Sequence, residues 1–252
     1  MLILLPPSEG KTAPKRGKPL DLAALSAPGL TSPRERVLDA LVTLCGDDPA
    51  AAAAVLEVPR TQLELVSLNA SLRTAPTARA DAVYAGVLYD ALGTAALSPA
   101  ARRRAGSRVR VVSSLFGMVA PADRIPSYRL SGDAVLPGLG SVAGVWRQSL
   151  GPEITGLVGD GLLVDLRSSV YTAFWRPSGL PRVATVRVVH EVRGRRQVVS
   201  HFNKATKGRI VRALLEDGAN PRSPARLAEA LRDLGWTVEE TPTRLDVVVS
   251  EL

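Results

Sequence analysis

The sequence predicts a single α+β domain with a mixed central sheet, spanning residues 1–252. Two observations predict it. Helical periodicity dominates from Pro33 to Arg104, after one apolar run, whereas strand-like runs and hairpin signals gather after Arg108. This order differs from the regular βα alternation of a parallel α/β fold. No linker or change in composition divides the chain, so we expect one domain with a helix-rich N-terminal part and hairpins in its C-terminal half.

The N-terminal part begins with a short apolar run. Leu2–Leu5 is typical of a buried strand, ended by Pro6-Pro7, and Gly10–Pro19 predicts a loop. Ser32-Pro33 and Ser98-Pro99 each place an N-cap residue before a proline that suits the first helical position. Helices are expected from Ser32 to Cys45, over Ala50–Leu56, over Thr61–Leu72, from a Thr77 cap through Leu88, and over Ala100–Arg104.

The remaining elements mix strands and helices. Strands are expected at Val109–Ser113, Leu162–Leu166, Arg182–Val192, Gln197–Phe202, Trp236–Glu240 and Arg244–Ser250. The tetrapeptide "RGRR" is expected to join the third and fourth of these as a hairpin. Helices are expected at Ser141–Leu150, Asn203–Leu215 and Ala225–Leu234, the last capped by Ser223-Pro224.

The chain is strongly basic, with a formal net charge of +8 and a pI near 10.2. Only five of its 32 basic residues are lysines, so 27 are arginines. A GC-rich genome accounts for arginine in place of lysine, but it does not account for the surplus of positive charge. That surplus favours a partner rich in phosphate, such as a nucleic acid or a nucleotide.

The single cysteine, Cys45, excludes an intramolecular disulfide, a cysteine-rich zinc site and a paired thiol switch. This usage fits a reducing cytosol. Leu2–Leu5 is too short for a signal sequence or a membrane span, and no basic segment precedes it. We therefore expect a cytoplasmic protein without a membrane partner.

The segment Gly10-Lys11-Thr12 raises the question of a phosphate-binding P-loop. That motif needs a glycine five positions before Gly10, where this chain has Leu5. It also needs a helix directly afterwards, which Pro14, Gly17 and Pro19 forbid. The segment is instead expected to carry Ser8, Glu9 and Lys11 on a loop at a sheet end.

Metal and triad chemistry find little support. The two histidines, His190 and His201, are expected on paired strands, and neither has a carboxylate at ligand spacing. The Gly-x-Ser-x-Gly pattern of a nucleophile elbow is absent from the sequence. No metal or other cofactor is therefore expected.

Polar residues gather at three strand ends, where they would converge if those strands share a sheet. The three clusters are Ser113, Ser114, Gly117, Pro121, Asp123, Tyr128 and Arg129; then Asp165, Arg167, Ser168 and Tyr171; then Ser200, His201, Lys204, Lys207 and Arg212. Lys204 and Lys207 are expected on one face near a helix N-terminus. Cations there oppose the helix dipole, which suggests that they meet an anion.

Five segments occur in an order that is similar to one known family. They are the N-terminal strand with "LPPSEGK", then "VYAGVLYDAL", "VSSLFGMVAPADRIPSYRL", "VDLRSSVY" and "SHFNKATKGRIVR". Together they resemble the YaaA family of bacterial peroxide-stress proteins over essentially the whole chain. The resemblance implies an α+β domain with a positively charged cleft, DNA binding, and a cytosolic role in limiting damage from iron and hydrogen peroxide.

The resemblance also implies a helix-hairpin-helix element, expected at Val83–Leu92, Gly93–Leu97 and Ser98–Arg104. This hairpin has one glycine where such elements usually have two. The family's common polar positions correspond to Lys11, Tyr84, Ser114, Gly117, Asp123, Tyr128, Arg129, Asp165, Ser168, Tyr171, Lys204, Lys207, Gly208 and Arg212.

Three functional hypotheses follow. In the first, the protein binds double-stranded or structured DNA by neutralising phosphates without reading sequence. The residues expected to hold the anion are Lys11, Arg102, Arg103, Arg104, Arg129, Arg167, Lys204, Lys207 and Arg212. An iron-handling scaffold is a third reading, which the lack of a His/Cys/carboxylate cluster disfavours.

The second hypothesis is an enzyme acting on a nucleotide, a nucleobase or a small phosphorylated ligand. It is motivated by carboxylates, which weaken binding to a phosphate backbone but suit proton transfer in a pocket. The catalytic candidates are Glu9, Lys11, Asp165, Tyr171 and Lys204, in a cleft also lined by Ser8, Tyr84, Ser114, Asp123, Tyr128 and Ser168.

Overall fold

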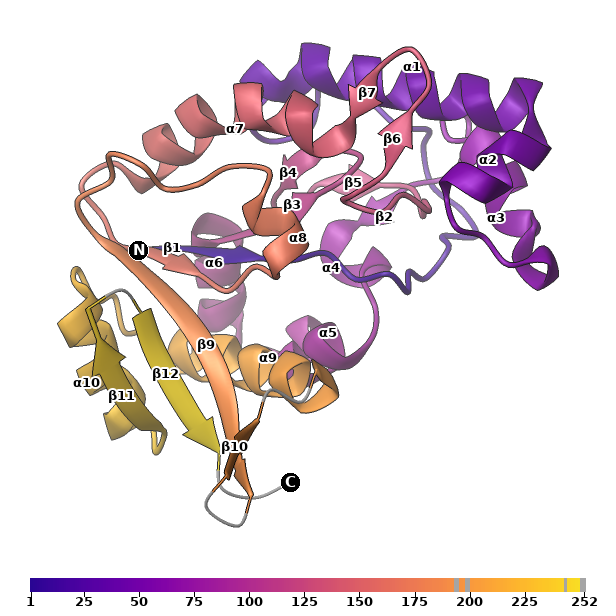
Figure 1. Cartoon of the computed structure of the whole chain (residues 1–252). Helices are drawn as coiled ribbons and strands as arrows, with labels where there is room; N and C mark the ends of the chain where they lie inside the picture. Colours follow the sequence, from indigo (N-terminus) through magenta and orange to yellow (C-terminus); the bar gives the residue numbers. More distant parts are fainter. Residues whose placement is uncertain (193–194, 198–199, 243, 250–252) are drawn as a thin grey trace.

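The computed structural model describes residues 1–192, 195–197, 200–242 and 244–249. The strands of its central sheet are β1 (Leu2–Leu5), β3 (Val109–Ser113), β4 (Gly117–Val119), β8 (Leu163–Asp165), β9 (Val183–Val192), β10 (Arg195–Gln197), β11 (Thr237–Thr241) and β12 (Arg244–Val249). They lie in the order β11-β12-β9-β8-β1-β3-β4, with β10 also paired to β9 (Figure 1). The five inner strands are mutually parallel, whereas β4, β10 and β11 run antiparallel to their neighbours. The α+β prediction with a mixed sheet is confirmed.

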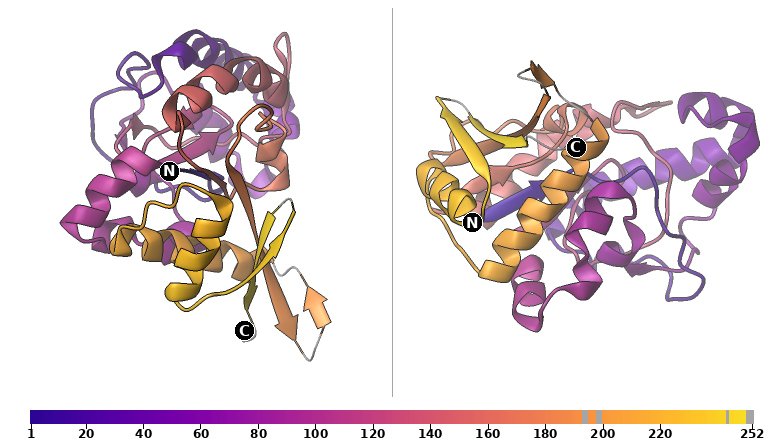
Figure 2. Two further views of the ribbon diagram at one scale, coloured as in Figure 1. Left: turned by 90° about the vertical axis from the view of Figure 1, so that its left-hand side faces the viewer. Right: turned by 90° about the horizontal axis from the view of Figure 1, so that it is seen from below.

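Helices cover both faces of this sheet. They are η1 (Pro28–Leu30), α1 (Thr31–Asp47), α2 (Pro49–Val55), η2 (Arg60–Gln62), α3 (Glu64–Ala70), α4 (Ala80–Val83), α5 (Val87–Leu92), η3 (Thr94–Ala96), α6 (Pro99–Arg108), α7 (Val142–Val158), α8 (Ser169–Thr172), α9 (Ser200–Asp217) and α10 (Pro224–Asp233). Figures 1 and 2 show α1 and α7 together on one side of the sheet, and α6, α9 and α10 on the other. All four residues of β1 are buried because both faces of the strand are covered.

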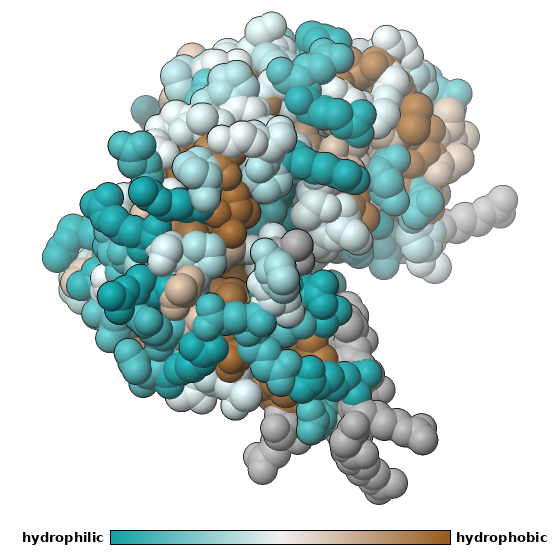
Figure 3. Space-filling model, turned by 60° about the vertical axis from the view of Figure 1, so that its left-hand side comes forward, coloured by the Kyte–Doolittle hydropathy of each residue, from teal (hydrophilic) through white to brown (hydrophobic). Residues whose placement is uncertain are grey.

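Two small antiparallel ribbons complete the fold. The first pairs β2 (Ala78–Arg79) with β5 (Arg124–Ile125), and the second pairs β6 (Val135–Leu136) with β7 (Gly140–Ser141). Hydrophilic residues cover most of the face drawn in Figure 3, and apolar residues emerge between them in narrow patches. In the described part of the chain, none of the helices combines the length and apolar character needed to cross a membrane.

The helix caps predicted from Ser-Pro pairs have mixed outcomes. Ser98 and Ser223 accept hydrogen bonds from the backbone N–H groups three residues later, which confirms both caps. The third pair is not a cap, because η1 leads directly into α1 and places Ser32 and Pro33 inside its first turn. Proline is tolerated there, since that N–H has no partner within the helix.

Two expected N-terminal helices are interrupted. The Thr61–Leu72 helix is divided into η2 and α3. Thr77 does not cap a helix, because its hydroxyl donates to the Lys18 carbonyl and the chain continues into β2. Gly86, with φ of 99°, then separates α4 from α5. The expected continuous helix from Thr77 to Leu88 was therefore wrong.

In the C-terminal half, α7 extends past the expected end at Leu150 to Val158 and includes Pro152. The expected hairpin is confirmed, since β10 includes Gln197 and pairs antiparallel with β9. The extension of its second strand to Phe202 was wrong, because Ser200 already begins α9 and His201 lies on that helix. Phe202 instead packs its ring 5.6 Å from that of His190, which buries apolar area without strand pairing. Residues 193 and 194 of the expected turn lie outside the described residues.

Candidate functional site

The carboxyl ends of three parallel strands meet at one edge of the sheet. β1 lies between β3 and β8, with Leu5 paired to Val111 and Leu4 paired to Asp165. The chain segments that follow these strands are therefore neighbours, next to α8 at the middle of the molecule (Figure 1). We call the side chains gathered here the strand-end site. Its members are Glu9, Lys11, Tyr84, Ser113, Tyr128, Arg129 and Tyr171.

The loop after β1 is held against the end of α4. Lys11 pairs with Tyr84 in an isolated antiparallel bridge, and Thr12 N–H donates to the Val83 carbonyl at 2.8 Å. Ala85 N–H donates to the Gly10 carbonyl at 3.2 Å and to Ser8 Oγ at 3.2 Å. These bonds fix the backbone on both sides of Lys11, so its side chain points inward from an ordered loop.

Lys11 is the cation at the centre of the site. Its Nζ lies 4.1 Å from the centroid of the Tyr128 ring and 5.9 Å from that of Tyr84. It donates to the carbonyls of Ser8, at 2.8 Å, and Glu9, at 3.3 Å. The pKa of Lys11 is lowered to about 7. Burial is the main cause, the nearby Arg129 guanidinium adds to it, and the Glu9 carboxylate opposes both. The amine is therefore partly unprotonated at neutral pH.

Hydroxyl groups form a connected set beside Lys11. The Tyr84 and Tyr128 hydroxyls are 3.1 Å apart, and Ser113 Oγ lies 2.8 Å from the Tyr128 hydroxyl. Burial raises the pKa of Tyr84, Tyr128 and Tyr171, so the phenols stay protonated. Tyr89, which the sequence analysis did not select, donates its hydroxyl to the Pro6 carbonyl at 2.7 Å. These neutral phenols are buried or partly buried and can donate hydrogen bonds or protons.

An exposed carboxylate and a partly buried guanidinium border the site. Arg129 Nη1 lies 3.7 Å from Glu9 Oε2, and the Glu9 side chain is 87% exposed. Arg129 Nε is buried without a hydrogen-bond partner among the described residues. The buried Asn69 side chain bonds both backbone groups of Arg129, at 2.7 and 2.9 Å. Arg129 is thus held in place by its backbone while its side chain retains an unused donor.

Asp165 and Arg167 form a buried unit beside the site. Arg167 donates from Nε and Nη2 to the two Asp165 oxygens, at 2.9 and 2.7 Å, and from Nη1 to the Tyr171 carbonyl at 3.1 Å. Lys207 donates to the Leu166 carbonyl at 2.8 Å, and burial lowers its pKa while Asp165 opposes that shift. These groups use their hydrogen bonds on one another and on the backbone, and so hold the segment after β8 in place beside the strand-end site.

Ser168 and Lys204 are exposed at the rim, with Lys204 one helical turn before Lys207 on α9. Ser114, by contrast, is buried and donates to the Leu130 carbonyl at 2.7 Å. Of the predicted residues, Asp165 pairs with Leu4 of β1, Lys207 contacts the segment after β8, and Tyr171 lies near Tyr128 and Glu9.

Other candidates lie elsewhere. The Asp123 carboxylate accepts from Ser26 N–H, Ser26 Oγ and Ala120 N–H, which closes a loop against η1. Arg104 donates to the Leu215 and Glu216 carbonyls near the C-terminal end of α9. Lys204 is eleven residues from Leu215, about 16 Å along a helix. Arg102–Arg104 therefore do not join the strand-end site.

The region expected to form a helix-hairpin-helix contains α5, η3 and α6. Gly93 ends α5 with φ of 57°, a conformation that glycine adopts easily. Arg212 donates to the carbonyls of Leu92, Gly93 and Ala96, and Arg102 donates to that of Ala95. These guanidinium groups satisfy the hydrogen-bonding capacity of carbonyls in the hairpin itself, as cationic side chains do at helix C-termini.

Arg34 is a buried charge that the sequence analysis missed. Its guanidinium donates to the Phe116 carbonyl at 3.0 Å and to the Ser26 and Met118 carbonyls at 2.7 Å, and burial lowers its pKa to about 10. Nothing in the sequence around position 34 distinguishes it from a solvated helix arginine. Tyr89 could have been found, because it shares one segment with Tyr84.

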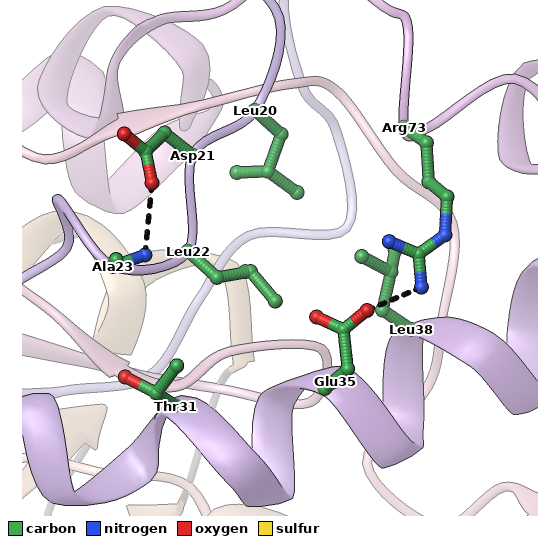
Figure 4. A pocket seen from close by; sticks show the side chains of 8 residues that line it. All are labelled: Leu20, Asp21, Leu22, Ala23, Thr31, Glu35, Leu38 and Arg73. Atoms are coloured by element: carbon green, nitrogen blue, oxygen red, sulfur yellow. Dashed lines mark hydrogen bonds and ion pairs between the residues drawn. The ribbon is translucent and has the colours of Figure 1, made fainter.

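The surface hollows lie away from this chemistry. Figure 4 shows one of about 350 Å³ lined by residues from Leu20 to Ala23, by α1 and by Arg73. Its polar groups pair with one another, as Arg73 does with Glu35 at 2.5 Å. Another, of about 630 Å³, lies between Arg147 and Trp175. The strand-end site differs from both hollows in holding a buried donor, Arg129 Nε, without a hydrogen-bond partner among the described residues. Within the described residues, no three His, Cys, Asp or Glu side chains are grouped to bind a metal.

Comparison with known proteins places the chain in a family. The family model described as "Peroxide stress protein YaaA" matches residues 1–241. A UPF0246 protein of Streptomyces coelicolor is 51% identical over 261 aligned positions, covering 100% of both chains. A UPF0246 protein of Corynebacterium efficiens is 42% identical and covers 95% of each chain. The chain therefore belongs to the YaaA family of peroxide-stress proteins.

Proposed function

We propose that this peroxide-stress-family protein limits oxidative damage by binding duplex DNA through basic residues that border the strand-end site. The family supplies the context of peroxide stress. The net charge of +8 supplies long-range attraction to a polyanion. The proposal needs, in addition, cations that are free to contact phosphates.

The observation that carries the proposal is a set of exposed cations without carboxylate partners. Lys15, Arg16 and Lys18 lie on the loop that begins at Lys11, and none of them forms an ion pair with another described residue. Arginines elsewhere, such as Arg79 and Arg196, are paired with carboxylates. Unpaired cations on one loop can each neutralise a phosphate without losing an existing ion pair.

Lys204 extends this surface on the other side of the site. It is exposed, and it lies one turn from Lys207, which contacts the segment after β8. The loop 12–18 starts against α4, where Thr12 N–H donates to the Val83 carbonyl, and α9 reaches the carboxyl end of β8 through Lys207. A duplex lying across both elements would meet cations from each.

The test measures the affinity for a fluorescent duplex at several salt concentrations. Replacing Lys15, Arg16 and Lys18 together by glutamine should reduce the slope of log K against log salt by about 2.7, at 0.9 per lost phosphate contact. The matched control replaces the exposed Arg36, Arg147 and Arg222 by glutamine. This control removes the same net charge from other surfaces, so its slope should remain close to that of the unmodified protein.

Two results would contradict the proposal. Affinity that does not change with salt would exclude phosphate neutralisation. Equal losses in the loop variant and in the control variant would show that net charge alone, and not this surface, attracts DNA.

A second candidate function is favoured by a different observation. Lys11 and Arg129 are neighbouring cations at a buried site, and Arg129 Nε lacks a hydrogen-bond partner among the described residues. Plain DNA binding does not require two partly buried neighbouring cations. This pair suits an enzyme that acts on a nucleotide, a nucleobase or a small phosphorylated compound, with the exposed Glu9 as a base.

This second candidate is tested by calorimetric titration with AMP, ATP and glycerol 3-phosphate. Binding that is lost in Lys11→Met and retained in Arg36→Gln, at an exposed position of α1, would support it. Absence of binding by all three compounds would count against it and would leave the DNA proposal unaffected.

A further inference from the structure

Lys11 has the surroundings of a nucleophilic amine. In its unprotonated form, the two N–H bonds can satisfy the Ser8 and Glu9 carbonyls, at 2.8 and 3.3 Å, and the lone pair remains free. Aromatic rings lie against the nitrogen, with the Tyr128 centroid at 4.1 Å. A lysine in an apolar enclosure next to another cation is the usual arrangement of imine-forming enzymes.

Arg129 gives the site a preference for an anionic group. Its guanidinium is close enough to Lys11 to lower the pKa of that amine. Its contact with Glu9 is loose, at 3.7 Å to a carboxylate that is 87% exposed. A ligand carboxylate or phosphate can replace Glu9 at lower cost than it could break the 2.7 Å Asp165–Arg167 pair.

Phenol hydroxyls can supply the proton that imine formation needs. Tyr84 and Tyr128 are the two aromatic residues against which Lys11 Nζ lies, and their hydroxyls are 3.1 Å apart. Ser113 connects to the same pair at 2.8 Å, so a proton lost by one phenol can be replaced through the set.

We propose that Lys11 forms an imine with an aldehyde or ketone that carries a carboxylate or phosphate, which Arg129 holds. The Lys11 lone pair attacks the carbonyl carbon, a C–N bond forms, and the carbonyl oxygen takes a proton from a phenol of the Tyr84–Tyr128 pair. The nitrogen then releases a proton to Glu9, and Glu9 passes that proton to the hydroxyl, which leaves as water as the C=N bond forms. The remaining N–H proton goes to the phenolate, which restores the phenol. Amine and carbonyl thus give imine and water, and no oxidant is consumed. The inference deepens the second candidate function and rests on it for a ligand at this site.

The experiment traps the imine by reduction. The full chain is incubated at pH 7.5 with sodium cyanoborohydride and one probe: glyoxylate, pyruvate, glyceraldehyde 3-phosphate, or a duplex oligonucleotide with one abasic site. Peptide mapping then compares Lys11 with the other four lysines of the same sample. Lys11 should be modified at least about tenfold faster, since an amine with a pKa near 7 is mostly unprotonated at this pH. The probe that reacts fastest identifies the source of the carbonyl group.

Variants test the named roles. Lys11→Arg should abolish the fast modification, whereas Arg36→Gln, at an exposed position of α1, should retain it. Arg129→Gln should remove the preference for glyoxylate over the uncharged acetaldehyde, and Tyr128→Phe should slow trapping while leaving the ring in place. Because the comparison among lysines is made within the unmodified protein, it does not depend on the folding of any variant.

Three outcomes would overturn the inference. They are modification of all five lysines at equal rates, modification that spares Lys11, and equal reactivity of glyoxylate and acetaldehyde with the unmodified protein. Calorimetric binding of glycerol 3-phosphate without trapping at Lys11 would overturn the imine and preserve the second candidate function. Absence of both binding and trapping would overturn both.

Discussion

Lys11 is a partly buried cation that joins the loop after β1 to the Tyr84 and Tyr128 rings. Its backbone pairs with Tyr84, and its Nζ donates to two carbonyls of its own loop. Burial is the main cause that lowers its pKa, and Arg129 adds to the effect. The residue therefore imposes an energetic cost when charged, and this cost should be measurable.

The charge of Lys11 should change near neutral pH. In a protein with ¹³C-labelled lysine, the side-chain signal of Lys11 should titrate with a midpoint near 7. The spectrum contains only five lysine signals, and Lys11→Arg assigns the relevant one. A midpoint above 9.5 for that signal would contradict the burial of Nζ against Tyr128.

The same shift makes stability depend on pH. The pKa of Lys11 falls from 10.5 unfolded to about 7 folded, so the unfolded chain binds more protons between these values. Relative to Lys11→Met, the unmodified protein should gain stability as pH rises from 7 to 10.5. The gain should be about 2–5 kcal/mol, at ~1.4 kcal/mol per pKa unit. Urea unfolding of both proteins at several pH values measures it, and parallel stability curves would disprove it.

At the scale of elements, α5 and α9 pack closely against each other. The right-hand view of Figure 2, from below, shows the two helices next to each other. A Cβ atom on Gly208 would lie 2.2 Å from the Leu88 carbonyl oxygen and 2.9 Å from Leu92 N. The lack of a side chain at position 208 therefore allows α9 to bring Lys207 to the end of β8.

Gly208→Ala should destabilise the protein by about 1–3 kcal/mol, because backbone atoms of α5 cannot move aside as a flexible side chain can. The control is Gly156→Ala in α7, where an added Cβ meets nothing within 4 Å. That variant should gain up to about 1 kcal/mol from helix propensity. Urea midpoints at constant m-value compare the two, and a stabilised Gly208→Ala variant would contradict the close packing.

Local sequence signals predicted those features that depend on interactions between residues close together in the chain. The caps at Ser98 and Ser223 were predictable because each hydroxyl bonds a backbone group three residues away. Thr77 has the same kind of side chain, yet its hydroxyl donates to the backbone carbonyl of Lys18, 59 residues earlier in the chain. The start of α9 was missed for a similar reason, since Phe202 packs against His190 of β9.

The candidate site was predictable in part. Polar residues that follow β1, β3 and β8 meet because those strands are parallel neighbours, and this much the strand-end pattern indicated. Asp123 shows the limit of that reasoning. It is close in sequence to β4, but it bonds Ser26, and nothing in the spacing of either residue predicted that pairing.

At the scale of the whole molecule, the positive charge is carried almost entirely by arginine. Of the 32 basic residues, 27 are arginines, and the chain has only two histidines. Arginine stays protonated far above neutral pH. The attraction to a polyanion should therefore be nearly constant across the pH range in which Lys11 changes its charge.

Affinity for duplex DNA should accordingly vary less than about twofold between pH 6 and pH 9, at constant ionic strength. Fluorescence anisotropy with a labelled duplex measures this. A loss of affinity centred near pH 7 would instead identify Lys11 as the principal DNA contact, because its pKa lies there. The experiment therefore separates the overall charge of the molecule from the chemistry of its central lysine.

The position of β1 in the sheet has a consequence for synthesis of the chain. β1 is translated before both of its partners, which are β3, more than a hundred residues later, and β8, which ends at Asp165. The apolar segment Leu2–Leu5 must consequently stay unpaired until most of the polypeptide has been translated. Long-range pairing of this kind slows folding and exposes apolar strands to aggregation. The nascent chain thus has the greatest need of chaperone protection before residue 165 emerges, and the loop after β1 that carries Lys11 is placed only after that.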